Sequence, residues 1–252
     1  MAKLSRNEKE IKNNLKIFFD NYAKRQKSYL KNPLHRYQKM KRYLHAIQTG
    51  KISKNDVVLE IGCGVGYQIP TIASRCRFYY GIDFSSNAVK FASNFKTANA
   101  KTKVADVSHL PFRKRFFDVV LIIDTLENIY DREKVLSEAS RVLKFGGRIV
   151  VSVPNVNSLY GLAKKYFLHD SKLLPPVDTW FNSEAITNLI ENHGFRITEL
   201  RGSFYLPPFF TGRHYVIPSS ELFVKIYDFA ENFLSKNLKT LGYHIIICAR
   251  KD

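Results

Sequence analysis

The chain has 252 residues, 45% of them hydrophobic, which is enough apolar material for one large globular domain. No apolar run approaches the roughly 20 residues of a membrane span, and the N-terminal sequence MAKLSRNEKEIK lacks the apolar core of a secretory signal, so we expect a cytoplasmic protein. The three cysteines fit neither a metal site nor a disulfide framework, and the formal net charge of +18 indicates either an anionic partner or a solvated lysine-rich surface.

The N-terminal region is predicted to form two amphipathic helices, separated by a break at Asn32 and Pro33. Residues 1–55 contain 15 Lys and Arg and 3 acids, so this segment carries +12 (15 − 3) and leaves +6 (18 − 12) for the rest of the chain. Such a basic extension can meet an anionic membrane surface or RNA, or it can simply keep the protein soluble. The apolar positions with helical spacing are Ile11, Leu15, Phe18, Tyr22 and Tyr29 before the break, and Leu34, Tyr37, Leu44 and Ile47 after it.

From Asp56 onward, strands and helices alternate, a pattern typical of a parallel sheet covered by helices on both faces. The runs predicted as strands are 57–61, 78–82, 102–105, 117–123, 148–153, 195–200 and 243–249. After the fifth strand we expect a helix over 156–168, a loop over 174–181, and a helix from the cap Ser183 to about His193. An aromatic, proline-interrupted loop then leads to a last helix that begins at Ser219 or Ser220.

The segment VVLEIGCGVG, residues 57–66, predicts a ligand-binding turn between the first strand and a helix. A dinucleotide-binding loop would place its last glycine at position 67, which is Tyr67, and no Gly-Lys-Ser or Gly-Lys-Thr follows for a phosphate-binding loop. Glu60 would repel a phosphate and favours a ligand with a cationic end. Asp83 after the second strand can accept both hydroxyls of a ribose, and Asp106 after the third can accept from an adenine amino group. A cationic amino-acid end, a ribose and an adenine together describe S-adenosylmethionine.

Four segments resemble, in order and spacing, the successive motifs of class I S-adenosylmethionine-dependent methyltransferases: VVLEIGCGVG, YYGIDFSSNAVKFA, ADVSHLPFRKRFFDVVLIIDTLENI and EASRVLKFGGRIVVSVPN. Within that superfamily they are most similar to the type 11 branch, which includes quinone and other small-molecule methyltransferases. The likeness covers about residues 50–155 and extends weakly to the C-terminus through DTWFNSEAITNLIENHGFRI and GYHIIICARK.

The resemblance implies a Rossmann-like α/β fold with a seven-stranded sheet in the order 3-2-1-4-5-7-6, of which only the last strand is antiparallel, and helices on both faces. Residues 51–252 would form the methyltransferase domain, with an insertion at about 203–240, and residues 1–50 a basic helical extension that caps the acceptor site. It also implies which residues surround the cofactor: Glu60, Gly62, Cys63, Gly64 and Gly66 at the methionine part, Asp83 and Phe84 at the ribose and adenine, Asp106 and Val107 at the adenine, and Asp124 near the sulfonium.

Methyl transfer from a sulfonium needs a well-placed acceptor, and a general base only if the acceptor is protonated. After the fourth strand, many members of the family have Leu-Glu-His, whereas this chain has Asn128 at the third position, and asparagine is no base at neutral pH. The remaining candidates for a catalytic group are Asp124, Glu127 and His214. No metal is implied. The apolar and aromatic residues outside the sheet predict a hydrophobic acceptor pocket, with Tyr22, Tyr160, Trp180 and Tyr205 as candidate contacts.

The leading hypothesis is therefore an S-adenosylmethionine-dependent methyltransferase that acts on a small hydrophobic or aromatic acceptor at oxygen or carbon, and releases S-adenosylhomocysteine. Such an acceptor could be a lipid or a quinone at a membrane surface that also attracts the basic N-terminus. An RNA methyltransferase, with transfer RNA as substrate, is the second reading, because residues 1–50 could follow a phosphate backbone. A methyltransferase-fold binding protein without catalytic activity is the third.

Overall fold

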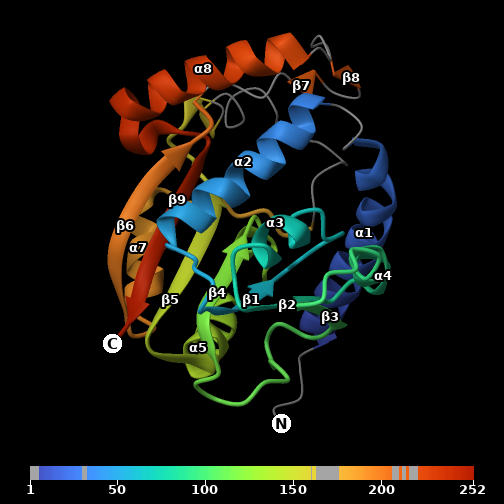
Figure 1. Cartoon of the computed structure of the whole chain (residues 1–252). Helices are drawn as coiled ribbons and strands as arrows, with labels where there is room; N and C mark the ends of the chain where they lie inside the picture. The colour runs from blue at the N-terminus through green and yellow to red at the C-terminus, as the bar shows by residue number, and fades with distance from the viewer. Residues whose placement is uncertain are drawn as a thin grey trace.

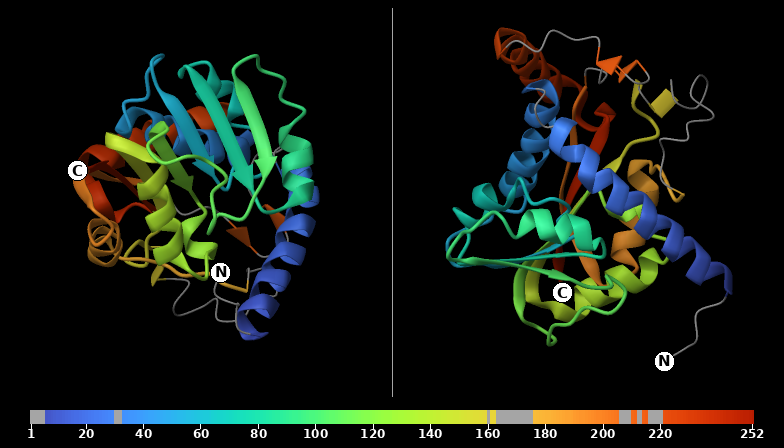
Figure 2. Two further views of the ribbon diagram at one scale, coloured as in Figure 1. Left: turned by 90° about the horizontal axis from the view of Figure 1, so that it is seen from below. Right: turned by 90° about the vertical axis from the view of Figure 1, so that its right-hand side faces the viewer.

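A seven-stranded mixed sheet with helices on both faces forms the centre of the computed structural model, which describes residues 6–29, 33–159, 161–162, 176–205, 210–211, 214–215 and 221–252 (Figures 1 and 2). The strands follow the order β3-β2-β1-β4-β5-β9-β6. Only β9 runs antiparallel to its neighbours β5 and β6. The predicted sheet order, with an antiparallel last strand, is thus confirmed. The strands are β1 (Val57–Ile61), β2 (Phe78–Asp83), β3 (Ala100–Val104), β4 (Phe117–Ile123), β5 (Leu143–Pro154), β6 (Phe195–Ser203) and β9 (His244–Lys251).

Helices connect most of these strands, and two long helices precede them. In Figure 1, α8 lies across the top of the view beside α2, and α1 stands at the right beside α4. The helices are α1 (Arg6–Tyr29), α2 (Pro33–Thr49), α3 (Ile69–Ala73), α4 (Ser86–Ala92), η1 (Leu126–Asn128), α5 (Arg132–Val142), α7 (Ser183–Glu191), α8 (Glu221–Leu238) and η2 (Lys239–Leu241). In the described part of the chain, none of them is long and apolar enough to cross a membrane.

Two hydrophobic clusters, one on each face of the sheet, form the core. Alternate residues of a strand point to opposite faces. On one face Leu59 of β1 packs in a cluster with Leu136 of α5 and Ile186 of α7. On the other face the neighbouring Val58 belongs to a cluster with Ile47 of α2 and residues of α3. The second N-terminal helix is therefore part of the folded core.

The structure differs from the sequence-based expectations at several element boundaries. β5 begins at Leu143 instead of residue 148, because it already pairs with Phe117 of β4. The cap of α7 is Asn182, whose side chain accepts from the Ala185 N–H at 2.7 Å, so the prediction of Ser183 as the cap was wrong. The predicted aromatic loop contains two short paired strands, β7 (Phe210–Thr211) and β8 (His214–Tyr215). Most of the helix expected over 156–168 lies outside the described residues.

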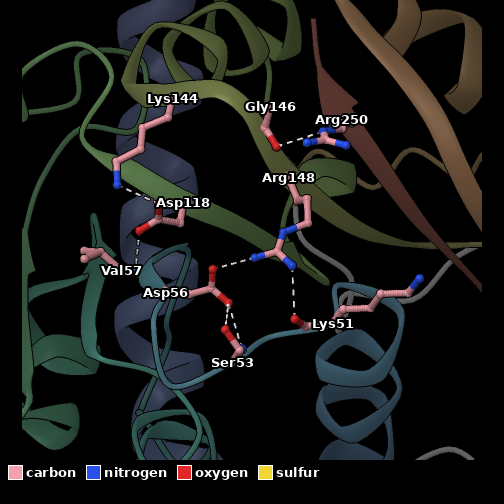
Figure 3. A network of polar contacts seen from close by, with 9 residues as sticks. All are labelled: Lys51, Ser53, Asp56, Val57, Asp118, Lys144, Gly146, Arg148 and Arg250. Atoms are coloured by element: carbon pink, nitrogen blue, oxygen red, sulfur yellow. Dashed lines mark hydrogen bonds and ion pairs between the residues drawn. The ribbon is translucent and has the colours of Figure 1, made fainter.

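A network of polar contacts links the parallel strands at their amino ends (Figure 3). The Asp118 carboxylate at the start of β4 accepts the backbone N–H of Val57 at 2.8 Å and pairs with Lys144 at 2.6 Å. Beside it, Asp56 pairs with Arg148 of β5 at 2.5 Å. These contacts join β1, β4 and β5 at one end of the sheet. Ligand-binding loops of open α/β sheets lie at the carboxyl ends of the strands, away from this network.

We expect Asp118→Ala to lower the free energy of unfolding by about 1–3 kcal/mol, because the partly buried Val57 N–H loses its acceptor. Lys144→Ala is the matched control, since it removes only the half-exposed ion pair and should cost less than about 1 kcal/mol. Urea unfolding of both variants measures the two values. Equal losses would show that the ion pair, and not the N–H acceptor, is what matters.

Candidate functional site

A cavity of about 1140 Å³ opens at the carboxyl ends of β1, β2, β3 and β4. Its lining comes from the loops that follow these strands and from both N-terminal helices, which contribute side chains between Lys12 and Tyr43. Tyr243 and His244, at the amino end of the antiparallel β9, also line the cavity. Segments that are far apart in the sequence thus converge on one hollow at the end of the sheet where α/β proteins bind their ligands.

The glycine loop forms the floor of this cavity. Gly62 has φ +81°, and a side chain there would lie 2.3 Å from Thr125 Oγ1, so only glycine fits. A Cβ atom added at Gly64 would meet no other atom within 4 Å, which leaves this backbone open to a ligand. Gly62, Cys63 and Gly64 line the cavity. Gly66 lies beyond the lining and packs against Ala92 of α4, so it serves the turn into the next helix.

Glu60 lies beneath the loop and does not reach the cavity lining. Its fully buried carboxyl group accepts from Gln68 Nε2 at 2.9 Å and from the Tyr79 hydroxyl at 2.5 Å. Gln68 also donates to the Cys63 carbonyl at 2.8 Å, so Glu60 supports the loop through this amide. Burial raises the pKa of Glu60 to about 7, although hydrogen bonds from Tyr79, Gln68 and Tyr43 oppose the rise. In this structure, Glu60 positions the loop from behind.

The raised pKa of Glu60 predicts a pH-dependent stability. The folded state keeps this proton up to about pH 7, whereas the unfolded chain releases it near pH 4.5, so the free energy of unfolding should fall between these values. The expected fall is about 3 kcal/mol in the wild type, and it should be absent from the stability curve of Glu60→Gln. Denaturant unfolding from pH 4 to pH 8 measures it. Glu191→Gln, at an exposed position, is the control, and a parallel pH curve for Glu60→Gln would contradict the assignment.

Asp83 and Phe84 follow β2 and line the cavity next to the glycine loop. The Asp83 carboxylate is 8% exposed, and it accepts the backbone N–H of Gly64 and that of Ser85, each at 2.9 Å. Burial raises the pKa of Asp83, and these backbone hydrogen bonds oppose the rise. Because a carboxylate has about four lone-pair sites, the two oxygens can still accept from two ligand hydroxyls.

Asp106 and Val107 follow β3 and also line the cavity. Asp106 accepts the Ser108 N–H at 2.8 Å and pairs with Lys12 of α1 at 3.2 Å. Burial acts to raise the pKa of Asp106, but Ser108 and the Lys12 ammonium outweigh it and lower this pKa. Phe19 of α1 stacks edge to face on Phe84, with ring centroids 5.7 Å apart. The first helix is thus fastened across the loops after β2 and β3.

Asp124, directly after β4, is the centre of a partly buried charged cluster. Arg42 Nε of α2 lies 2.9 Å from its Oδ2, and His244 Nδ1 of β9 lies 3.2 Å from its Oδ1. Arg42 also lies 2.8 Å from His244 Nε2. Since a guanidinium only donates, Nε2 accepts, and the neutral imidazole carries its proton on Nδ1, toward Asp124. The guanidinium of Arg42 stands over the ring of Phe204, 5.5 Å from its centroid.

The charges of this cluster set the pKa values of its members. Burial acts to raise the pKa of Asp124, but Arg42 and His244 outweigh it and hold this pKa well below its ordinary value. Burial lowers the pKa of His244, in agreement with the neutral tautomer. Asp124 has φ +49° and Phe204 φ +60°, a left-handed conformation that costs of order 1–3 kcal/mol per residue and is common at functional sites.

Glu127 lies one turn after Asp124, and its pKa is shifted in the opposite direction. It is 7% exposed and lines the cavity, and its Oε2 has no hydrogen-bond partner among the described residues. Burial, together with the negative charge of Asp124, raises the pKa of Glu127 well above its ordinary value. A buried carboxyl group with an unused oxygen is poised to exchange a hydrogen bond or a proton with a ligand.

The predicted acceptor contacts fall in three classes. Tyr22 of α1 and Trp180 line the cavity, together with other aromatic residues. Tyr205 is buried away from the lining, where its backbone N–H donates to the Glu231 carboxylate at 2.9 Å. Tyr160 lies outside the described residues, as does the side chain of His214. The aromatic side chains of the described lining are Phe18, Phe19, Tyr22, Tyr43, Tyr67, Phe84, Tyr130, Trp180, Phe204 and Tyr243.

The site fits a nucleoside ligand with a cationic amino-acid end. The open backbone at Gly64 and the carboxylates of Asp83, Asp106 and Asp124 supply the surfaces that such a ligand requires. Ligand pockets usually measure about 300–1,000 Å³, so a volume of about 1140 Å³ leaves room for a second molecule. The described residues contain no group of three or more His, Cys, Asp or Glu that could hold a metal ion.

Comparison with known proteins supports the same assignment, because a family model described as a methyltransferase domain matches residues 59–151. The chain belongs to the type 11 class I S-adenosylmethionine-dependent methyltransferases. S-adenosylmethionine is the cofactor of this family, and methyl transfer is its reaction. The sequence resemblance to this family is therefore confirmed.

Three relatives show how far the likeness extends along the chain. An uncharacterised protein of Methanocaldococcus jannaschii is 30% identical over 77% of this methyltransferase and 78% of its own length. A protein of Mycolicibacterium smegmatis named as a probable S-adenosylmethionine-dependent methyltransferase is 30% identical, over 59% of this chain and 55% of its own. The demethylmenaquinone methyltransferase of Tropheryma whipplei is 29% identical, over 58% of this chain and 69% of its own.

Solved structures share the fold of this methyltransferase at low sequence identity. A chain from the complex between the Haloferax volcanii Trm112 methyltransferase activator and a methyltransferase has a TM-score of 0.67 and 19% identity, over 94% of this chain and 96% of its own. An S-adenosylmethionine-dependent methyltransferase of Thermotoga maritima has a TM-score of 0.65 and 18% identity, over 94% and 100%. These two likenesses concern the fold alone.

Sequence reasoning missed Arg42, His244 and Lys12 as members of the site. Arg42 and Lys12 are two of many basic residues in amphipathic helices, and nothing in the local sequence distinguishes them. His244 had a usable signal. A strand that runs antiparallel brings its first residue to the carboxyl ends of the parallel strands, and His244 is the first residue of β9.

Proposed function

We propose that this methyltransferase transfers the methyl group of S-adenosylmethionine to an oxygen or carbon atom of a small hydrophobic or aromatic acceptor. The size of the cavity carries the proposal, because about 1140 Å³ extends from the glycine loop to aromatic side chains of α1, Trp180 and Tyr243. The printed name of one relative, a demethylmenaquinone methyltransferase, supports an acceptor of this chemical class. The cofactor would lie against Gly62, Gly64, Asp83, Phe84, Asp106 and Val107, with Asp124 toward its sulfonium.

The cofactor supplies an activated methyl group, so the protein mainly has to position the acceptor and keep water out. Glu127 is the residue we assign to the acceptor hydroxyl. In its protonated form, Glu127 can donate a hydrogen bond to an acceptor oxygen. A cationic ligand in the same cavity favours the ionised carboxylate, which can then take the hydroxyl proton as general base. Asp124 is a poor base, because its negative charge is held by Arg42 and His244.

We also propose that the N-terminal helices, within residues 1–50, cap the acceptor part of the site. The cap is supported by the pairing of Lys12 with Asp106, the stacking of Phe19 on Phe84, and a hydrogen bond of 2.5 Å from the Ser85 hydroxyl to Asp20. α2 contributes Arg42 to the cavity lining, where it pairs with Asp124. Such a cover suits methyl transfer, because it would limit the access of water to the reacting groups.

We expect Asp83→Ala to lower the affinity for S-adenosylmethionine by about 100-fold or more, since hydrogen bonds to a charged group contribute about 1.5–3 kcal/mol each. Isothermal titration calorimetry measures this affinity. Asp118→Ala is the matched control, because Asp118 lies at the other end of the sheet, and it should bind the cofactor as the wild type does. Unchanged affinity of Asp83→Ala would refute the cofactor site.

The acceptor is tested by methyl transfer from labelled S-adenosylmethionine to a panel of hydroxylated aromatic and lipid compounds. We expect Glu127→Gln to lower kcat for a hydroxyl acceptor by about 100-fold or more, with cofactor affinity unchanged, as is typical for loss of a general base. Glu184→Gln, at an exposed position of α7, should retain full activity. Full activity of Glu127→Gln would remove Glu127 from the reaction.

Label in transfer RNA instead of the small-molecule panel would contradict the proposed acceptor class. RNA binding through the basic extension would fall steeply with salt concentration, and the double variant Lys16→Gln, Lys24→Gln, at exposed positions of α1, would reduce that dependence. Cofactor binding without any methyl transfer, on either kind of acceptor, would favour a methyltransferase fold used only for binding.

A further inference from the structure

α8 carries a stripe of apolar side chains that are largely exposed to solvent. Leu222, Ile226, Phe229 and Phe233 follow helical spacing along one face, and they are 68%, 59%, 77% and 63% exposed. Six of the twelve large hydrophobic residues exposed in the described part of the chain lie between Leu222 and Leu241. Exposed apolar residues that gather on one element mark an interaction site. In Figure 1 this helix lies along the outer edge of the molecule.

Two of the three acidic residues of α8, Asp228 and Glu231, contact other parts of the protein, although the Asp228 side chain is 37% exposed. Asp228 accepts from Lys41 and from the Tyr37 hydroxyl of α2, each at 2.5 Å. Glu231 is 4% exposed and accepts the backbone N–H of Tyr205. Both carboxylates are therefore turned away from the apolar stripe. Between Glu221 and Leu234, the other charged residues exposed to solvent are Glu221 and Lys225.

This neutral, apolar face belongs to a chain with a large positive charge. The whole chain carries a net charge of +18, and Arg36 is exposed on α2, the helix that packs along α8. A second copy of the chain would bring an equal positive charge to the stripe, so charge opposes self-association there. An anionic lipid bilayer has the complementary charge and an apolar interior for Leu222, Ile226 and Phe229. The right-hand view of Figure 2 also shows α8 at the outer edge of the molecule.

We propose that α8 is a membrane-binding helix, which lies in the interface of an anionic bilayer with Leu222, Ile226 and Phe229 inserted among the acyl chains. The helix has 18 residues and would cover about 27 Å of membrane surface. Long-range attraction comes from the net positive charge of the chain. This inference goes beyond the proposed function, because membrane binding does not depend on which acceptor the site takes.

Vesicle flotation with the full chain tests this proposal. We expect binding to vesicles of phosphatidylcholine mixed with phosphatidylglycerol, weaker binding to phosphatidylcholine alone, and release at high salt concentration. The triple variant Leu222→Ser, Ile226→Ser, Phe229→Ser should lower the bound fraction by about tenfold or more. Phe145→Ser is the matched control, because Phe145 is 61% exposed at the start of β5 and should not contribute.

A second variant gives a readout that does not depend on the triple variant being folded. Phe229→Trp adds one tryptophan to Trp180, the only one in the wild type. On vesicles that contain brominated acyl chains, its fluorescence should be quenched more strongly than that of the wild type. Calorimetry with S-adenosylmethionine reports whether each variant retains the cofactor site, separately from membrane binding.

Three results would overturn the proposal. The first is a wild-type chain that does not float with anionic vesicles, and the second is equal flotation of the triple variant and the wild type. The third is a wild-type dimer that the triple variant converts to a monomer, measured by size exclusion with light scattering, since that result assigns the stripe to a second copy. Absence of methyl transfer, by contrast, would affect the proposed function and leave this proposal intact.

Discussion

The ion pair between Arg42 and Asp124 is the interaction on which the site depends. It joins the second N-terminal helix to the end of β4, and His244 adds the first residue of β9 to the same cluster. The pair is partly buried, with side-chain exposures of 13% for Arg42 and 24% for Asp124, so removal of one partner leaves a charge with little access to water and no compensation. The N-terminal helices are therefore bound to the sheet at the point where the cavity begins, and they form part of the site itself.

Asp124 of this ion pair and the neighbouring Glu127 have pKa values that their surroundings shift in opposite directions. Asp124 meets a guanidinium and an imidazole and stays ionised, whereas Glu127 is buried beside the charge of Asp124 and keeps its proton. Neighbouring groups with opposite pKa shifts are a common way in which one site holds a fixed charge and a movable proton. Here the fixed charge is suited to a cationic donor, and the movable proton to the acceptor.

The positions of the seven strands could be predicted from local signals, namely alternating apolar runs and turn residues, whereas their order came from the family resemblance. β1 and β4 have the predicted bounds, and the glycine loop lies where its spacing placed it. The role of Glu60 was harder to foresee, because it depends on contacts with Gln68 and Tyr79, and the distance to Tyr79 along the chain is long. Arg42 joined the site only through tertiary packing of α2. Local sequence patterns thus predicted the strands and the glycine loop. The contacts of Glu60 and Arg42 join distant segments and could be seen only in the folded structure.

The contact between Lys12 and Asp106 has a thermodynamic consequence. Asp106 is both the partner of α1 and a residue that would hold the cofactor, so the helix and the ligand would share one carboxylate. By linkage, the factor by which a ligand on Asp106 changes the docking of α1 equals the factor by which that docking changes ligand affinity. The affinity of the methyltransferase for its donor is therefore coupled to the docking of its own first helix, and a partner that binds this basic helix would act on the cofactor site from outside.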